Sequence, residues 1–403
     1  MKNKFILLKV SYFFIYTLMI VCLGIILNII YKSITSEASI NSSFPSLVYL
    51  LYFLIYIPIL ILGIWLMRRI KSKLKLLYPD KYLPAGPLTK KLFLRKTIKA
   101  LIYSIIGCSF ILIIVPFAIV YFITSHHVYY RNNSLLQMTY TASDFGLTEN
   151  ILSLKTDDNL SIWASEIPAA EPKAIIILLT GIEQPSITQF YPHAKMYQEK
   201  GYSSILLEVR GHGKSDGNKI CLGYDEILDV KATLDYIKTK EEYKNIPIIL
   251  HGVSMGGAIA INAFGQYHEL DGLIAMSAYA TFEDVLIDNL KFYNIPDFIC
   301  NIEKPIIKLA LTASFGTDKV NNMNPITQIK NTGDRPTLLV AASGDASVPM
   351  ENTKAIYEAS LNTDLWILDS WEHFIVKNCV LAKVNEDKEY CNKIFEFIQK
   401  VTD

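Results

Sequence analysis

Residues 251–257 of the 403-residue chain read His-Gly-Val-Ser-Met-Gly-Gly, and this stretch decides the fold. It follows an apolar run that predicts a strand, and it precedes a pattern that predicts a helix over residues 255–267. A Gly-x-Ser-x-Gly pattern between a strand and a helix is typical of a tight turn that exposes a reactive serine. Gly252 and Gly256 suit such a turn because larger side chains would collide there. We therefore expect Ser254 to be a nucleophile.

Outward from this turn, short β-branched runs alternate with longer amphipathic stretches, which is typical of an α/β domain with a mainly parallel sheet. The runs predict strands over residues 151–155, 161–164, 174–180, 203–208, 247–251, 272–277, 337–342 and 365–369. The amphipathic stretches predict helices over residues 186–200, 224–240, 255–267, 350–360 and 384–401. The first two strands are joined by a turn rich in Asp and Asn, so we expect them to form a hairpin.

A nucleophilic serine needs a histidine base and an acid that orients the base, and after such a turn they follow in that order, acid before histidine. Of seven histidines, only His373 lies well beyond Ser254 and after an acid at a strand end. Asp345 is the expected acid because it lies on the loop that directly follows the strand over residues 337–342. The alternatives near the same strands are Asp334, Asp364 and Asp369.

Attack on a carbonyl creates an oxyanion, which two preorganised backbone N–H groups must stabilise. One is expected from Met255, the residue after the serine, and the other from the loop after the third strand, at Ile182. Gly252 and Gly256 complete the predicted turn. This chemistry needs neither a metal nor an organic cofactor.

Residues 208–217 read Glu-Val-Arg-Gly-His-Gly-Lys-Ser-Asp-Gly and contain a false lead. Gly213-Lys-Ser looks like the end of a phosphate-binding loop, but that motif needs a glycine five positions earlier, where Glu208 stands. The nucleotide interpretation therefore fails. We interpret the segment as a tight loop in which Arg210 and His212 have structural roles.

Taken together, residues 208–217, the Ser254 turn, Ser-Gly-Asp-Ala-Ser-Val-Pro at 343–349 and Glu-His-Phe at 372–374 resemble the α/β-hydrolase superfamily. The similar branch groups serine aminopeptidase-like proteins with monoacylglycerol-lipase-like enzymes, and the resemblance covers about residues 150–400. It implies an α/β-hydrolase fold, with a mainly parallel sheet flanked by helices. Two positions depart from the family pattern: Glu208 replaces the usual Asp, and Thr180-Gly replaces the commoner His-Gly before the oxyanion loop.

A long insertion, residues 280–331, separates the sixth and seventh predicted strands and is rich in apolar residues. In the α/β-hydrolase fold an insertion here resembles a small helical cap over the serine. An apolar underside would favour acyl chains as substrates. The alternative is a group of helices that simply pack on the core.

The N-terminal third has a different composition, which predicts two regions, residues 1–130 and 131–403. Residues 1–130 carry 15 Lys and Arg against two acidic residues, which gives +13, and because the whole chain is +1 the remainder carries −12. An acidic globular part argues against a nucleic-acid partner, since phosphate binding needs clustered basic side chains.

Three apolar stretches, at about residues 10–31, 45–67 and 100–124, are long enough to cross a bilayer as helices. The basic segment over residues 68–99 is expected on the cytoplasmic side. Three spans then place the domain after Thr124 on the outer face. Abundant Ile, Lys and Asn suggest a bacterium, so we expect an integral protein of a bacterial cell membrane.

Four cysteines lie in the region expected outside: Cys221, Cys300, Cys379 and Cys391. An oxidising compartment would permit a Cys379–Cys391 bridge and a Cys221–Cys300 bridge, and the alternative is four buried free thiols.

The sequence thus predicts a membrane-anchored serine hydrolase that cleaves carboxylic esters, either small-molecule or lipid esters, through an acyl-enzyme. A peptidase or an acyltransferase of the same fold uses the same intermediate and stays an alternative. A catalytically inactive membrane scaffold is the alternative from another class.

Overall fold

The computed structural model describes residues 15, 61, 63–66, 68–70, 112–128, 140–182, 186–292 and 294–403. The chain divides into two compact units, Met1–Ser39 with Pro45–Ile119, and Ile40–Phe44 with Val120–Asp403. This division lies closer to the N-terminus than the boundary after residue 130 that the charge pattern predicts. The second unit contains every element discussed below.

The three predicted membrane spans fall largely outside the described residues. Of residues 10–31 only residue 15 is described, of 45–67 only five residues are, and of 100–124 only those from residue 112 onward. Within the described ranges, no helix is both long enough and apolar enough to cross a membrane. The spans therefore stay predictions.

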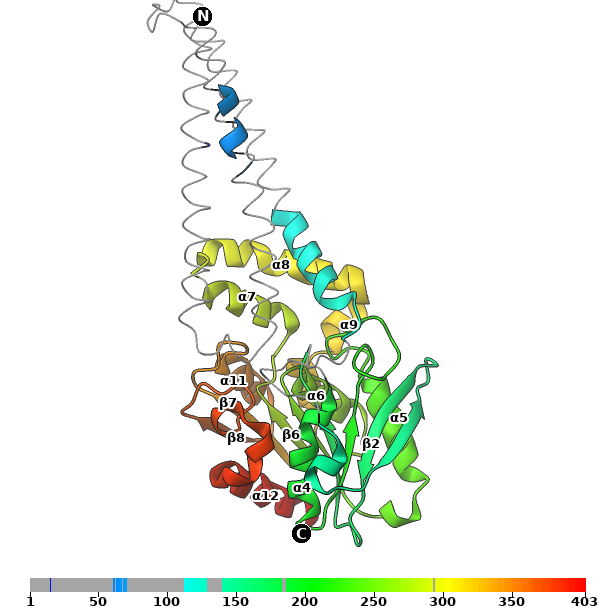
Figure 1. Cartoon of the computed structure of the whole chain (residues 1–403). Coiled ribbons are helices and arrows are strands. Elements are labelled where there is room, and N and C mark those ends of the chain that lie inside the picture. Colours follow the sequence, from blue (N-terminus) through cyan, green and yellow to red (C-terminus); the bar gives the residue numbers. More distant parts are fainter. Residues whose placement is uncertain are drawn as a thin grey trace, which may run out of the picture. The chain divides into compact units, whose positions relative to one another are not determined.

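An eight-stranded sheet forms the centre of the described part of the second unit (Figure 1). Its strands are β1 (Asn150–Lys155), β2 (Ser161–Ile167), β3 (Ile175–Leu179), β4 (Ser203–Leu207), β5 (Ile248–Val253), β6 (Gly272–Met276), β7 (Thr337–Ala342) and β8 (Asp364–Leu368). Their spatial order is β1-β2-β4-β3-β5-β6-β7-β8. The β1–β2 hairpin and the β2–β4 pair are antiparallel, and the other neighbours are parallel. The predicted hairpin and the mainly parallel sheet are both confirmed.

Helices connect the strands and cover both faces of the sheet. Outside the insertion they are η2 (Ala142–Phe145), η3 (Ile187–Phe190), α4 (Tyr191–Gln198), α5 (Ile227–Lys238), η4 (Glu241–Tyr243), α6 (Met255–Gln266), α11 (Met350–Ala359), η6 (Lys377–Cys379), η7 (Leu381–Glu386) and α12 (Lys388–Thr402).

Two predicted helices are each divided in the structure. The stretch over residues 186–200 begins as η3 and continues as α4, whose first turn contains a proline. The stretch over residues 384–401 is interrupted at Asp387, which caps α12 by accepting a hydrogen bond from the Tyr390 amide at 3.0 Å. A capping aspartate satisfies an N–H that the first helical turn leaves free, so it fixes a helix start there.

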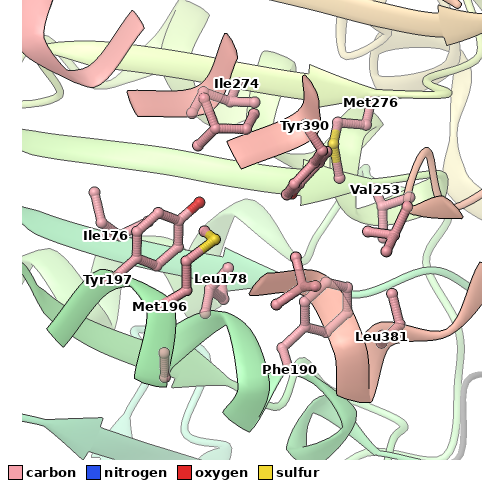
Figure 2. Packing of buried hydrophobic residues seen from close by; sticks show 14 of the residues in the cluster. Ile176, Leu178, Phe190, Met196, Tyr197, Val253, Ile274, Met276, Leu381 and Tyr390 are labelled. Carbon is pink, nitrogen blue, oxygen red and sulfur yellow. The ribbon is translucent and has the colours of Figure 1, made fainter. Parts of the chain in front are cut away.

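One face of the sheet packs against α4 and α12 (Figure 2). Alternate side chains of β3 point to this face, Ile176 and Leu178, and they meet Tyr197 of α4 and Tyr390 of α12 in one buried cluster. Burying each large apolar side chain contributes about 1.5–3 kcal/mol. Val253 belongs to the same cluster and directly precedes Ser254, so this core fixes the strand end that carries the serine.

Residues 280–331 form α7 (Phe282–Phe292), α8 (Asp297–Phe315), α9 (Thr317–Asn322), α10 (Pro325–Gln328) and η5 (Ile329–Asn331). We call α7 and α8 the cap helices. The Ala280 amide, just before α7, donates to Asn352 of α11 at 3.1 Å, and Lys219, in the loop after β4, donates to the Ser314 carbonyl of α8 at 2.7 Å. Since α11 follows β7 and Lys219 follows β4, the cap helices lie at the carboxyl end of the sheet, where α7 and α8 are seen together (Figure 1).

For the three cysteines whose side chains the structure describes, the free-thiol alternative holds and the bridges do not. Cys221, Cys300 and Cys391 are free and buried, so neither Cys221–Cys300 nor Cys379–Cys391 forms. The Cys391 thiol instead donates to the Val384 carbonyl at 3.2 Å. Burial raises the pKa of the Cys221 thiol, which keeps it protonated and unreactive.

Two buried histidines below the serine turn predict acid sensitivity. Burial lowers the pKa of His251 to about 3 and holds the pKa of His193 well below its usual value. Both rings are thus neutral in the fold. Their contribution to stability is complete above the unfolded pKa of about 6.5 and is lost as the pH falls toward the folded value, because the unfolded chain binds protons first.

Substitutions of His193 and His251 distinguish the contributions of the two residues to stability. Neither ring nitrogen of His193 has a hydrogen-bond partner among the described residues, whereas His251 Nδ1 lies 2.6 Å from the Tyr197 hydroxyl. His193→Leu should leave the midpoint temperature of unfolding at pH 7 unchanged. Between pH 7 and 4, this midpoint should fall less in the variant than in the parent protein. His251→Leu should cost about 1–3 kcal/mol at pH 7 by leaving a buried hydroxyl unpaired. Thermal unfolding across pH 4–8 measures both, and an unchanged pH dependence in His193→Leu contradicts the account.

Candidate active site

Ser254 lies between β5 and α6 in a backbone conformation that is rare for any residue other than glycine. Its φ is 59° and its ψ is −123°. Its amide donates to the Met276 carbonyl at 2.8 Å, which continues the β5–β6 pairing through the turn. Such strain persists only when the surroundings enforce it, and it is concentrated at functional sites. The sheet thus holds the serine in a fixed, sharply turned position.

The two glycines of the turn are required by space. A Cβ on Gly252 would lie 2.1 Å from the Gly256 carbonyl oxygen, and one on Gly256 would lie 2.4 Å from the Leu179 carbonyl oxygen. Both contacts are with backbone, which cannot move aside. The turn is therefore pressed against the end of β3, where the loop that contains Ile182 begins.

Asp345 and His373 form a hydrogen-bonded pair. Asp345 Oδ2 lies 2.6 Å from His373 Nδ1, and its Oδ1 accepts hydrogen bonds from the amides of Ser347 at 2.8 Å and Val348 at 3.1 Å. The carboxylate is almost fully buried. Because it can only accept, Nδ1 carries the proton and Nε2 is left as the acceptor nitrogen, which is the tautomer that a general base needs.

None of the alternative aspartates contacts His373. Asp364 pairs with Lys400 at 3.0 Å on the surface, and Asp369 accepts a hydrogen bond from Ser343 at 3.1 Å. Asp334 lies in the turn before β7.

The backbone of the histidine loop is attached to the strand beside the serine. Ser277, the residue after β6, donates from its hydroxyl to the His373 carbonyl at 2.8 Å. Met276, its neighbour, accepts from the Ser254 amide. The side chains of Ser254 and His373, both described, are not joined by a hydrogen bond. In ligand-free enzymes such a bond is often long and tightens when substrate binds.

The predicted oxyanion donors occupy different kinds of position. Met255 is the first residue of α6, and the first amides of a helix have no partner within the helix. Its N–H is therefore available beside the serine. Ile182 is the last residue of the described range 140–182, and its role stays a prediction.

Two polar residues near His373 were not predicted from the sequence. Ser277 fixes the backbone of His373, and Glu372 accepts from the Asn378 amide at 2.8 Å, which fastens the loop after the histidine. A lone serine after a strand and an acid beside a histidine form no pattern of their own. The one available signal for Ser277 is its position directly after a parallel strand, because ligand sites lie at the carboxyl ends of such strands.

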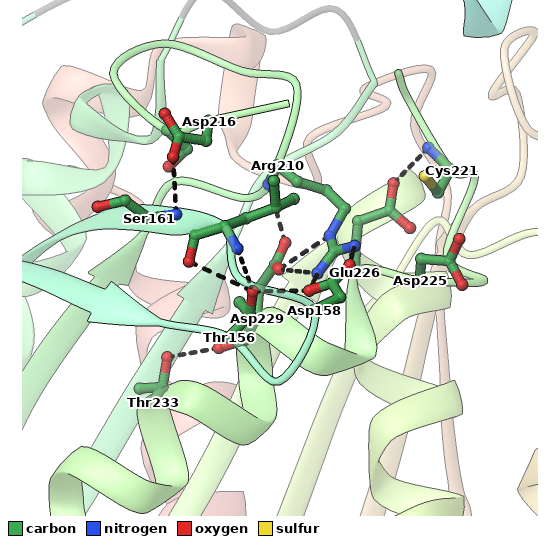
Figure 3. Close-up of polar contacts among 12 residues, drawn as sticks. Thr156, Asp158, Ser161, Arg210, Asp216, Cys221, Asp225, Glu226, Asp229 and Thr233 are labelled. Atoms are coloured by element: carbon green, nitrogen blue, oxygen red, sulfur yellow. Dashed lines mark hydrogen bonds and ion pairs between the residues drawn. The ribbon is translucent and has the colours of Figure 1, made fainter. Parts of the chain in front are cut away.

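The segment over residues 208–217 has the structural role that the sequence predicts (Figure 3). Arg210 donates to Asp229 at 2.7 Å and to Asp158, in the β1–β2 turn, at 2.6 Å, which ties the hairpin to α5. Arg210 and Asp229 are both buried, so removing one partner should cost about 3–5 kcal/mol. His212 Nδ1 lies 3.1 Å from the Arg210 carbonyl oxygen. In the part of the chain that is described, no group of His, Cys, Asp and Glu is arranged to hold a metal ion.

Several known proteins resemble this chain in sequence or in fold. A family model described as serine aminopeptidase, S33, matches residues 170–293. The chain is 23% identical over 234 residues to the uncharacterized protein YqkD of Bacillus subtilis, an alignment that covers 57% of this chain and 72% of YqkD. It is 30% identical over 102 residues to the monoglyceride lipase of Mus musculus, covering 23% of this chain and 31% of the lipase. A solved esterase of Pyrococcus furiosus superposes with a TM-score of 0.52 at 22% identity, covering 66% of this chain and 95% of the esterase.

These similarities and the order of the strands support the α/β-hydrolase superfamily, and the chain has the α/β-hydrolase fold. The named relatives are hydrolases where a function is given, which supports a hydrolase. The lipase match spans less than a third of that enzyme, so its substrate is not transferred on this ground.

The geometry of Asp345 generates a direct prediction. Asp345→Asn should lower the rate at which a serine-directed phosphonate labels the protein by about 10³–10⁴-fold, because an amide favours the wrong tautomer of His373. Asp369→Asn is the matched control and should leave the labelling rate within about twofold. Stopped labelling assays followed by intact mass measure both rates. Equal losses in the two variants are incompatible with Asp345 as the acid.

Proposed function

We propose that the chain is a membrane-anchored serine hydrolase that cleaves carboxylic esters. Ser254 Oγ attacks the ester carbonyl while its proton passes to Nε2 of His373, which Asp345 orients. The amides of Met255 and Ile182 stabilise the oxyanion. The alcohol leaves with the proton from His373, and water then releases the acid from the acyl-enzyme by the same steps. The observation that carries the proposal is the buried Asp345–His373 pair whose loop is bonded to the strand next to the strained serine.

The proposed substrate class, carboxylic esters, rests on the similar proteins and on the apolar cap helices. A monoglyceride lipase and an esterase among the similar proteins favour esters, whereas the description of the matching family favours an amide-cleaving peptidase. The cap helices bury apolar side chains such as Ile307 and Leu311, which suits acyl chains but also serves packing between the helices. Exposed Phe298, Ile302 and Leu309 of α8 add to its apolar character.

Turnover measurements test the proposal. The full chain should hydrolyse p-nitrophenyl esters of some acyl length between two and sixteen carbons faster than aminoacyl anilides. Ser254→Ala should lower this turnover by roughly 10⁴-fold or more without a loss of folding. Ser153→Ala, on the exposed edge strand β1, is the control and should match the parent. Undiminished hydrolysis by Ser254→Ala contradicts the assignment, and anilide turnover above ester turnover favours the peptidase.

The membrane anchor, with the catalytic unit on the outer face, is tested by accessibility. A protease added to intact spheroplasts of an expressing bacterium should digest the region after Thr124 and spare the basic segment over residues 68–99. Fragments are identified by mass spectrometry. If the catalytic region is digested only after lysis, the orientation is the opposite of the one proposed. Undigested full-length chain in the soluble fraction would contradict the membrane anchor.

A further inference from the structure

The two departures from the family pattern, Glu208 and Thr180, meet at one loop: Thr180 begins the loop, and Glu208, which directly follows β4, contacts its other end. This loop connects β3 to η3, and its described ends are residues 180–182 and 186–187. Under the proposed function, on which this inference rests, it supplies the second oxyanion donor.

Glu208 holds the far end of the loop. Its Oε2 accepts a hydrogen bond from the Ser186 hydroxyl at 2.8 Å, and its Oε1 accepts one from the Ile187 amide at 3.0 Å. Glu208 and Ser186 are fully buried. A carboxylate acceptor makes such bonds roughly twice as strong as a neutral one does.

Glycine provides the room that the longer acid occupies. A Cβ on Gly213 would lie 2.3 Å from Glu208 Oε2, so the carboxylate fills the space beside a residue that has no side chain. Gly213 also has a φ of +52°, which favours glycine. The Gly213-Lys-Ser segment, which looks like part of a phosphate site, thus serves to accommodate Glu208.

Thr180 holds the near end. Its hydroxyl accepts a hydrogen bond from the Gln189 side-chain amide at 2.6 Å, and both residues are buried. Gln189 lies in η3, whose first turn is fastened by Glu208 through Ser186 and Ile187. The two ends of the loop are therefore fixed to the same short helix, next to the point where Gly256 meets the carbonyl of Thr180.

We propose that Glu208 is a positioning residue for the oxyanion loop: it fixes η3, and η3 fixes Thr180 and the adjoining Ile182 amide through Gln189. Oxyanion donors act only within about 2.7–3.1 Å of the developing charge, so a small shift of the loop weakens catalysis. Aspartate in place of Glu208 is shorter by one C–C bond, about 1.5 Å, which opens both hydrogen bonds. Glu208 and Thr180 thus contact the same short helix, η3.

The matched control is Glu226, an equally buried acid that also accepts two bonds. Its carboxylate oxygens accept from the amides of Cys221 at 2.7 Å and Gly223 at 2.8 Å. Within the described part of the chain, it makes no hydrogen bond to the loop between β3 and η3. Glu226→Asp therefore reproduces the burial and the lost bonds without touching the oxyanion loop.

The experiment compares an oxygen ester with its thionoester, whose sulfur is a poor hydrogen-bond acceptor and gains little from oxyanion donors. For Glu208→Asp we expect kcat on the oxygen ester to fall about tenfold or more with KM within about twofold. The ester-to-thionoester ratio of kcat should fall with it. Glu208→Gln should recover part of the ratio, since its amide can still bond Ser186 and Ile187, and Glu226→Asp should leave the ratio unchanged.

Thr180→Val tests the other end with a side chain of similar size and should lower the same ratio even if Glu208→Asp fails to fold. A ratio that stays constant in Thr180→Val and in every folded Glu208 variant overturns the inference, as does an equal fall in Glu226→Asp. The proposed function fails separately, through the absence of Ser254-dependent turnover in the parent protein, and that result also removes this inference.

Discussion

The crowded turn at Ser254 is the constraint on which the rest of the site depends. Backbone atoms of β3, β5 and α6 approach so closely that Gly252 and Gly256 have no space for a Cβ. The serine is driven into a positive φ, and its amide is bonded to β6. A loop cannot hold such a conformation alone, but a parallel sheet buried on both faces can. The packing of Val253 in the hydrophobic core thus stabilises the strained conformation of Ser254.

Around that turn, buried polar groups are satisfied by specific partners that fix each loop. Two amides and one imidazole surround Asp345, and the Ser277 hydroxyl holds the backbone of His373. Glu208 holds the start of η3 in the same manner. A buried charge without partners is costly, so each acid also limits how its loop can move. The carboxyl ends of β3, β5, β6, β7 and β8 are in this way drawn into one site.

The sequence predicted the sheet closely because its strands are compact β-branched runs separated by turn residues, and the predicted and observed ranges differ by a few residues at most. It missed the breaks at Asp387 and before α4, which depend on local capping rather than on apolar periodicity. It could not choose between the disulfides and free thiols, because cysteine spacing does not reveal where side chains lie in the fold, and the structure has Cys221, Cys300 and Cys391 free. The Asp345–His373 contact could be expected from chain order, since the fold orders its acids and bases. Ser277 and the clamp at Glu208 could not, because backbone-directed bonds leave no sequence motif.

The central claim is that Ser254, rather than any other serine at this end of the sheet, is the nucleophile. Ser277 is the sharpest competitor, because it follows the neighbouring strand, has a φ of +48° and contacts the backbone of His373. The most direct measurement is peptide mass mapping of the full chain after reaction with a serine-directed phosphonate. The account predicts a single adduct, on the peptide that contains Ser254. An adduct on the peptide that contains Ser277, or none under conditions in which the protein turns over esters, would contradict it.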